Sequence, residues 1–278
     1  MKKIVILYHK DCLDGFGAAW AAWKKFGLEA DYIAVQRGEL LPTGLKNKIV
    51  YTVDFTYRGE LMSKLLKIAS EVIIIDHHLS AEKTAKTASK YYFDLNHSGA
   101  VLAWKYFHPN KKIPFLLKTI EDFDIWKFKL PHTKTIDAYM NLLPFKFNEW
   151  EKITKDLENR ASREKIIAEG DAILNYQKEV IKKALKTVNF VKFEGRRVPI
   201  VNSAVLSSEI GHELAKKYKS FGVIWKQVEG GKIRVSLRSV GNLDVSKIAQ
   251  KYGDGGGHKN AAGFTLSDIS KLPWKKIK

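Results

Sequence analysis

Short apolar runs alternate with amphipathic segments along the first half of the chain. Three runs are rich in β-branched and other apolar side chains, as expected of buried strands: residues 3–8, 49–53 and 72–75. Four segments space their apolar positions as helices do: residues 15–26, 59–69, 98–107 and 113–123. Because strands alternate with helices, the pattern predicts a parallel sheet in an α/β fold.

The second half of the chain is organised differently. Residues 161–187 form a long, charged helical pattern without a strand signal, which we interpret as a connector. Beyond it, apolar runs predict strands over residues 197–202, 221–228 and 232–239, and a helix over residues 207–218. We therefore expect an N-terminal parallel-sheet domain (1–160), a helical linker (161–187) and a smaller C-terminal α/β domain (188–278).

Length and charge narrow the classes of partner. The chain has 278 residues, enough for two domains, and its 45% hydrophobic content excludes a disordered chain. Lys and Arg number 48 against 30 Asp and Glu, a net charge of +18, which favours polyanionic partners such as nucleotides or nucleic acid. Residues 188–278 hold 17 Lys and Arg against 7 Asp and Glu, so the smaller domain carries more than half of the excess.

Cysteine content and the N-terminal segment indicate the compartment. The single cysteine, Cys12, excludes an internal disulfide framework and a cysteine-rich zinc site, and we expect it to be a buried, inert thiol. The first apolar run breaks at His9, too early for a signal peptide or a membrane span. These features predict a cytoplasmic protein without a membrane partner, and they leave room for a homodimer.

Acidic and imidazole side chains follow all three predicted strands of the first half. The residues at these strand ends are His9, Asp11 and Asp14, then Asp54, then Asp76, His77 and His78. In an open parallel sheet, ligands bind beyond the carboxyl ends of the strands, so these side chains are expected to meet there. Clustered carboxylates repel one another unless protons or cations compensate them. Asp and His ligands suit Mn²⁺, and less well Mg²⁺, Zn²⁺ or Fe²⁺.

Each of these residues also has a purely structural interpretation. A single Asp at a strand end more often caps a helix than binds a metal, and Asp14 before Gly15 is placed to cap the predicted helix that follows. Two adjacent histidines after a β-branched run have no obvious packing purpose. The joint placement on three strand ends therefore favours a metal site over separate caps.

Two short motifs give the chain a family resemblance. Asp76-His77-His78, together with Gly255-Gly256-Gly257-His258 inside GGGHKNAAGF, resembles the DHH phosphoesterase family, and specifically its oligoribonuclease or nanoRNase-like members with a C-terminal DHH-associated domain. The order of the motifs and the gap between them also fit. The resemblance implies a metal-bearing N-terminal α/β domain, a C-terminal lid domain, and substrate in the cleft between them.

The same resemblance implies roles for the strand-end residues. His9 and Asp11 resemble ligands of one Mn²⁺, Asp14 and His77 resemble ligands of a second, and Asp54 resembles the bridging carboxylate. The family's fourth motif supplies a further Asp, for which Asp122 is the better match and Asp124 the alternative. Asp76 and His78 would act on His77 and on the substrate phosphate, which makes Asp76, His77 and His78 the candidate catalytic group. Many members space the first-strand acids two apart, whereas Asp11 and Asp14 are three apart.

The C-terminal signature has a mechanism of its own. Backbone N–H groups of Gly255, Gly256 and Gly257 can approach an anion closely, and a helix beginning at His258 would add its dipole. The family places a phosphate- or base-contacting arginine where this chain has Arg238. The alternative is a glycine-rich turn that precedes a hairpin.

The resulting expectation is a Mn²⁺-dependent phosphodiesterase, with Mg²⁺ as the alternative ion. A hydroxide held between two ions would attack phosphorus in line, without a protein nucleophile. Expected substrates are short oligonucleotides or linear dinucleotides, and the product is nucleoside 5′-monophosphate. The resemblance also permits cleavage of cyclic dinucleotides, of 3′-phosphoadenosine-5′-phosphate, or of polyphosphate. A non-catalytic nucleic-acid-binding scaffold is the rival from another class, although its metal-site residues would be expected to have degenerated.

Overall fold

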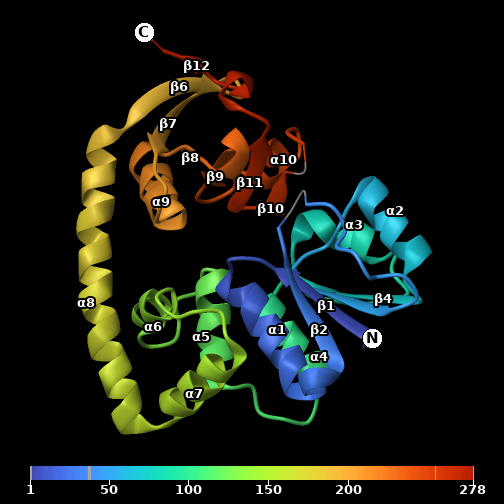
Figure 1. Ribbon diagram of the computed structural model, residues 1–278. Coiled ribbons are helices and arrows are strands. Elements are labelled where there is room, and N and C mark those ends of the chain that lie inside the picture. Colours follow the sequence, from blue (N-terminus) through green and yellow to red (C-terminus); the bar gives the residue numbers. More distant parts are fainter. Residues whose placement is uncertain (1, 37–38, 254, 278) are drawn as a thin grey trace. The chain divides into compact units, whose positions relative to one another are not determined.

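The chain forms two compact units in the computed structural model, which describes residues 2–36, 39–253 and 255–277 (Figure 1). Unit 1 covers Met1–Leu174 and unit 2 covers Asn175–Lys278. The division falls inside helix α8 (Arg160–Ala184), which occupies most of the expected linker. No helix of the described residues combines the length and the apolar composition that crossing a bilayer requires.

Unit 1 is built on a five-stranded parallel sheet. Its strands are β1 (Ile4–His9), β2 (Ala30–Val35), β3 (Ile49–Val53), β4 (Glu71–Asp76) and β5 (Lys90–Phe93). Their order is β2-β1-β3-β4-β5, and every neighbouring pair is parallel. The predicted α/β class is thereby confirmed. The chain leaves β1 toward β2 and then crosses to β3 on the other side, so the carboxyl ends of β1 and β3 flank the switch point where such sheets bind ligands.

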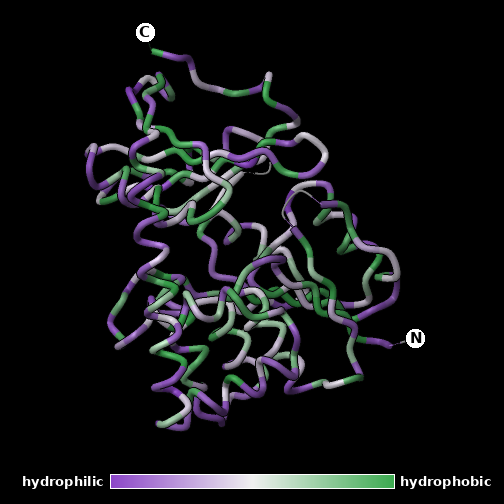
Figure 2. The backbone as a smooth tube through the Cα atoms, turned by 60° about the vertical axis from the view of Figure 1, so that its left-hand side comes forward, coloured by the Kyte–Doolittle hydropathy of each residue, from purple (hydrophilic) through white to green (hydrophobic). Residues whose placement is uncertain are grey.

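Successive residues of each strand point to opposite faces of this sheet, and apolar side chains lie on both faces. Helices therefore cover both faces. On one face, Ile6 and Val53 pack with α1 (Leu13–Phe26), α4 (Gly99–Phe107), α5 (Phe115–Asp124) and α7 (Phe147–Glu158). On the other, Val5 and Val50 pack with α2 (Gly59–Ile68) and α3 (Glu82–Ala85). Helix α6 (Thr133–Met140) joins the first cluster through Ile136. Figure 2 shows the strands as predominantly hydrophobic and long stretches of helix as hydrophilic.

Helix α1 packs closely against α4, and small residues allow it. A Cβ atom at Gly17 would lie 2.9 Å from the Cβ of Ala100, so only glycine fits at this crossing. Trp20 and Trp104 then stack with their ring centroids 5.5 Å apart. The close contact matters for the site, because α1 and α4 each contribute their first turn to it.

Unit 2 contains a seven-stranded mixed sheet. In spatial order its strands are β10 (Gly256–His258), β11 (Ala261–Leu266), β9 (Ile233–Arg238), β8 (Gly222–Gln227), β7 (Arg196–Asn202), β6 (Asn189–Phe193) and β12 (Lys275–Lys276). The pair β7–β8 is parallel and the other pairs are antiparallel. Helix α9 (Ser207–Tyr218) packs on one face through Ile210 and Leu214, against Val201 and Ile224. The short helix α10 (Val245–Ala249) belongs to the other cluster.

One expectation for unit 2 is wrong. No helix begins at His258; instead Gly256–His258 forms strand β10, which pairs antiparallel with β11. The run GGGHKNAAGF is thus a hairpin, in line with the structural alternative. As the edge strand of the sheet among the described residues, β10 pairs on one side only, so β11 can engage only alternate backbone groups of Gly256–His258.

Candidate metal centre

Asp54 lies at the middle of a cluster of acidic and imidazole groups. It directly follows β3, has a positive φ of 60°, and is 2% exposed. Its Oδ1 atom lies 3.1 Å from Nε2 of His77, and its Oδ2 atom lies 3.4 Å from Nδ1 of His9. The two oxygens of one carboxylate therefore face two different groups of side chains.

The first group consists of Asp14, His77 and Asp124. Nε2 of His77 lies 3.4 Å from Oδ2 of Asp14 and 3.6 Å from Oδ2 of Asp124. One ligand atom from each of the three residues lies within 4.8 Å of the others. These residues come from α1, from the end of β4 and from the last position of α5, so the fold brings together three distant parts of the sequence.

The carboxylate of Asp14 is fixed by the first turn of α4. Its Oδ2 accepts a hydrogen bond from the backbone N–H of Gly99 at 2.6 Å, and its Oδ1 accepts one from Ala100 at 2.9 Å. Asp14 lies inside α1, whose N-cap position is Cys12, so it does not cap its own helix. Only glycine fits at position 99, because a Cβ atom there would lie 2.6 Å from the Cβ of Asp54.

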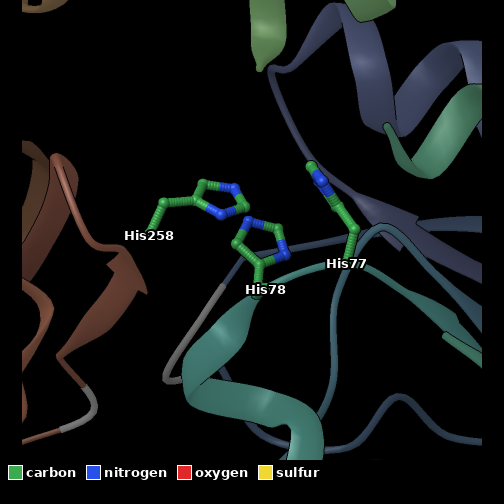
Figure 3. Close-up of side chains that lie close together, drawn as sticks. All are labelled: His77, His78 and His258. Carbon is green, nitrogen blue, oxygen red and sulfur yellow. The ribbon is translucent and has the colours of Figure 1, made fainter. Parts of the chain in front are cut away.

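Asp76 is saturated by hydrogen bonds from its neighbours. Its Oδ1 accepts from the backbone N–H groups of His77 (2.7 Å) and His78 (3.1 Å) and lies 2.6 Å from Nδ1 of His78. Its Oδ2 accepts from the hydroxyl of Thr56 at 2.6 Å. Figure 3 shows the two histidine rings projecting just beyond β4. Asp76 is therefore placed to orient both histidines.

The charges of the cluster shift its pKa values strongly. Burial alone would lower the pKa of His77, but the hydrogen bond with Asp54 and the nearby carboxylates raise it to about 10. Burial and the charges of Asp54 and Asp124 raise the pKa of Asp14 well above its usual range. Burial opposes ionisation of Asp54 as well, yet the bonds from His77 and His9 hold its pKa well below the usual range. The cluster thus attracts positive charge, which protons supply when no cation does.

The structure places Asp124 in the cluster and Asp122 outside it. The carboxylate of Asp122 accepts bonds from the backbone of Lys129 (2.8 Å) and Leu130 (3.0 Å) and from the hydroxyl of Thr133 (2.5 Å). It therefore holds the loop that follows α5. We correct the preference for Asp122, since a carboxylate engaged in three such bonds points away from His77, whereas Asp124 lies beside it.

Asp11 and Cys12 also differ from expectation. Asp11 has a φ of 53°, its side chain is exposed, and it forms no hydrogen bond or ion pair with another described residue. Cys12 is half-buried, not buried, and its Sγ lies 3.7 Å from Oδ2 of Asp54. His9, Cys12 and Asp54 form a second group whose ligand atoms lie within 4.8 Å of one another. Sequence reasoning did not consider the thiol as a ligand, although its position between the candidate ligands was a signal.

Two of the candidate substrate-binding residues, Arg238 and His258, lie in one row of the sheet of unit 2. Ala261 pairs with His258 on one side and with Arg238 on the other, so the two side chains leave the same face. The guanidinium of Arg238 donates to the hydroxyl of Ser208 at 2.7 Å. The glycines have a packing role: a Cβ atom at Gly255 would lie 1.9 Å from the oxygen of Ala249, and one at Gly257 would lie 2.4 Å from that of Ala261. Gly256 pairs with Gly263 in the hairpin.

Carboxylate oxygens and imidazole nitrogens are ligands that suit Mn²⁺, Mg²⁺ and Zn²⁺. His77 is surrounded by three carboxylates, of which those of Asp14 and Asp54 are buried and that of Asp124 is half-buried. This arrangement fits a site that takes divalent cations, because the mutual repulsion of the carboxylates would otherwise have to be relieved by protons.

Comparison with known proteins identifies relatives for both units. Residues 191–274 match the DHHA1 domain family. The uncharacterized protein R106 of Acanthamoeba polyphaga mimivirus is 34% identical over 299 aligned positions, which cover 98% of this chain and 70% of R106.

Two solved structures share the fold. A DHH domain from a member of a ribosomal-protein family has a TM-score of 0.62 and 14% identity, over 94% of this chain and 82% of that one. RecJ from Thermus thermophilus, in complex with Mn²⁺, has a TM-score of 0.53 and 16% identity, over 98% of this chain and 50% of RecJ.

Proposed function

Since the chain belongs to the DHH phosphoesterase family of metal-dependent phosphoesterases and carries a DHHA1 domain, we propose that it is a Mn²⁺-dependent phosphodiesterase. Its proposed substrates are short oligonucleotides or linear dinucleotides, and its product is nucleoside 5′-monophosphate. Mg²⁺ is the alternative ion. The RecJ structure of similar fold contains Mn²⁺, which supports this choice of metal.

One observation carries the proposal: Asp54 presents Oδ1 to His77 and Oδ2 to His9. A carboxylate with one oxygen in each of two ligand groups is what a two-ion centre requires of its bridging ligand. His9 and Asp54 would hold one ion, and Asp14, His77 and Asp124 would hold the other together with Asp54. When bound, the ions supply Lewis acidity toward the phosphate and an activated water.

The protein residues orient and insulate this centre. The negative charge of Asp76 fixes the tautomer of His78, because Nδ1 must carry a proton to donate to Oδ1 across 2.6 Å. Nε2 of His78 then faces away from Asp76, where it can interact with a substrate phosphate. Asp14 keeps its orientation through two backbone N–H groups of α4, so a ligand oxygen costs little reorganisation on binding.

Unit 2 supplies positive charge that suits a phosphate-rich substrate. Arg238 and His258 share one face of its sheet, and Ser208 holds the guanidinium. A groove of about 450 Å³, which we call the lysine groove, lies where α8 and α9 meet. Its lining residues are Lys178, Ile181, Lys182, Leu185, Lys186, Glu213 and Lys217. Four cations against one carboxylate favour contact with a nucleic-acid backbone.

The test is release of mononucleotide from a labelled RNA ladder of two to about twenty residues, with Mn²⁺, with Mg²⁺ and with chelator. Polyphosphate and 3′-phosphoadenosine-5′-phosphate serve as parallel substrates. We expect strong turnover of the shortest species, abolished by chelator and by His77→Ala. A matched control is His132→Ala, a histidine exposed on the loop before α6.

Other outcomes would overturn the proposal. Turnover of polyphosphate without turnover of RNA would assign the chain to phosphoanhydride hydrolysis. Retained RNA hydrolysis in His77→Ala would mean that the cluster around Asp54 is not the active centre. Tight RNA binding without hydrolysis of any substrate would favour the non-catalytic scaffold.

A further inference from the structure

We propose that Cys12 is a metal ligand, and that its sulfur completes the His9–Asp54 half of the centre. This inference rests on the proposed two-ion site. It means that the two halves of the site offer different ligand atoms. The Asp14–His77–Asp124 half offers only oxygen and nitrogen atoms, whereas the half at Cys12 also offers a thiolate.

The geometry around Asp54 supports this assignment. Sγ of Cys12 lies 3.7 Å from Oδ2 of Asp54, and that same oxygen lies 3.4 Å from Nδ1 of His9. Ligand atoms of all three residues lie within 4.8 Å of one another, a spacing from which one ion can contact all three. Sulfur, nitrogen and oxygen donors thus converge on one point, which is a characteristic donor set for Zn²⁺ and Co²⁺.

The backbone between β1 and α1 turns the thiol inward and the preceding acid outward. Asp11 adopts a positive φ of 53°, and its carboxylate is exposed and makes no ion pair with another described residue. Asp11, the ligand that the family resemblance implies, belongs to none of the groups of candidate ligand atoms that lie within 4.8 Å of one another among the described residues. Cys12, the next residue, occupies the place where that third ligand is needed.

Local helix chemistry gives no other reason for a cysteine here. Cys12 is the N-cap of α1, a position that favours Ser, Thr, Asp or Asn because their side chains accept a backbone hydrogen bond. The Cys12 side chain makes no such bond. Its backbone oxygen instead accepts from Phe16 at 3.0 Å, and its side chain faces Asp54.

Gly15 brings this turn against β1. A Cβ atom at position 15 would lie 2.2 Å from the carbonyl oxygen of His9 and 2.8 Å from its Cβ, so only glycine allows the contact. The first turn of α1 is thereby held against the strand end that carries His9. Placement of Cys12 beside His9 is consequently a product of the packing and does not depend on the metal.

Coordination has a simple balance. The thiol S–H bond breaks, the sulfur–metal bond forms, and one proton passes to solvent for each ion bound. Because thiolate is a soft ligand, this half of the centre will hold Zn²⁺ or Co²⁺ more tightly than Mn²⁺ or Mg²⁺.

Cobalt spectroscopy on the metal-free full chain tests the assignment. Cys12 is the single cysteine of the sequence, so any thiolate-to-cobalt charge-transfer band in the near ultraviolet must come from it. We expect Co²⁺ to produce this band together with visible d–d bands. Cys12→Ser should abolish the charge-transfer band, retain the d–d bands and lower Zn²⁺ affinity by about tenfold or more. Asp11→Asn is the matched control and should leave the charge-transfer band in place.

The readouts separate this inference from the function on which it rests. Cobalt binding with d–d bands but no charge-transfer band would show that Cys12 is not a ligand, while the centre itself stands. Absence of any cobalt binding would overturn both the ligand assignment and the metal centre. Alkylation of Cys12 supplies a second measurement: bound Zn²⁺ should protect the thiol, and equal alkylation rates with and without metal would contradict the proposal.

Discussion

Oδ1 of Asp76 and Nδ1 of His78 lie 2.6 Å apart, closer than the oxygens of Asp54 lie to His77 (3.1 Å) and to His9 (3.4 Å). The same oxygen accepts from the backbone N–H groups of both histidines, so one carboxylate sets the backbone and the ring together. The pKa of Asp76 is held below its usual range: burial opposes its ionisation, but the charge and hydrogen bond of His78 outweigh that effect. Asp76 thus stays ionised in the folded protein.

Asp76→Asn should therefore lower turnover without preventing folding. The amide keeps the shape but removes the negative charge that fixes the His78 tautomer, and losses of this kind are typically about 10–100-fold. Steady-state kinetics and the thermal midpoint measure the two effects. Thr56→Val removes a single neutral donor to Asp76 and should lower turnover less than Asp76→Asn does. Equal losses in both variants would contradict the role given to the charge.

Substitutions of Asp122 and of Asp124 should have different effects, the first on stability and the second on metal binding. Asp122→Asn disrupts a buried carboxylate with three donors, so we expect a loss of about 1–3 kcal/mol in the free energy of unfolding. Asp124→Asn should leave stability nearly unchanged and weaken Mn²⁺ binding. Calorimetric titration with Mn²⁺, beside urea unfolding of both variants, checks the assignment. The reverse pattern would restore Asp122 as the ligand.

The raised pKa of His77 predicts how the metal-free protein responds to pH. Its folded pKa is about 10 against an ordinary value of 6.5, so its contribution to stability is complete below pH 6.5 and is lost as the pH rises through about 10. We expect the free energy of unfolding in chelator to fall over this range by a few kcal/mol, on the order set by the linkage relation. Urea unfolding at several pH values measures it. His77→Gln should flatten this pH dependence. An equally steep fall in the variant would show that a group other than His77 causes it.

Gly99→Ala should damage the centre through packing alone. The added methyl group would lie 2.6 Å from the Cβ of Asp54 and 3.0 Å from Oδ2 of Asp14, so it displaces a bridging and a terminal ligand together. We expect Mn²⁺ affinity to fall by at least about tenfold, as measured by calorimetry. Gly195→Ala is the control: it has a positive φ of 73° but no atom within 4 Å, so it should cost stability and spare metal affinity.

Strand ends were predictable from the sequence because buried parallel strands are marked by β-branched runs. β1, β3 and β4 are of this kind, and their carboxyl ends carry His9, Asp54 and His77. β5 (KYYF) was not predicted, since it is an edge strand with mostly exposed positions. Its identity as a strand depends on pairing with β4, which local periodicity does not encode.

The choice between Asp122 and Asp124 shows where sequence reasoning ends. Residues two positions apart on an α-helix point in directions that differ by about 200°. The carboxylates of Asp122 and Asp124 therefore point to nearly opposite sides of α5. Which side faces His77 is set by how α5 packs on α1 and α4, and no spacing rule reports that. The hairpin at Gly256–His258 is similar: consecutive glycines fit a turn, a strand or a helix start, and pairing with β11 decides.

Charge reversal in the lysine groove should affect long substrates alone. Lys178, Lys182 and Lys217 line it, and each phosphate that the groove no longer neutralises should reduce the salt dependence of single-strand binding by about 0.7 in log–log slope. We expect Lys178→Glu, Lys182→Glu and Lys217→Glu combined to lower affinity for about 20-residue RNA and to reduce that slope by about 2, while dinucleotide turnover stays unchanged. Fluorescence anisotropy across salt concentrations, in chelator, measures the RNA affinity and the slope. Charge reversal of the exposed Lys64, Lys67 and Lys83 is the matched control for net charge. An equal loss of RNA affinity in this control would show that net charge, and not the lysine groove, determines binding.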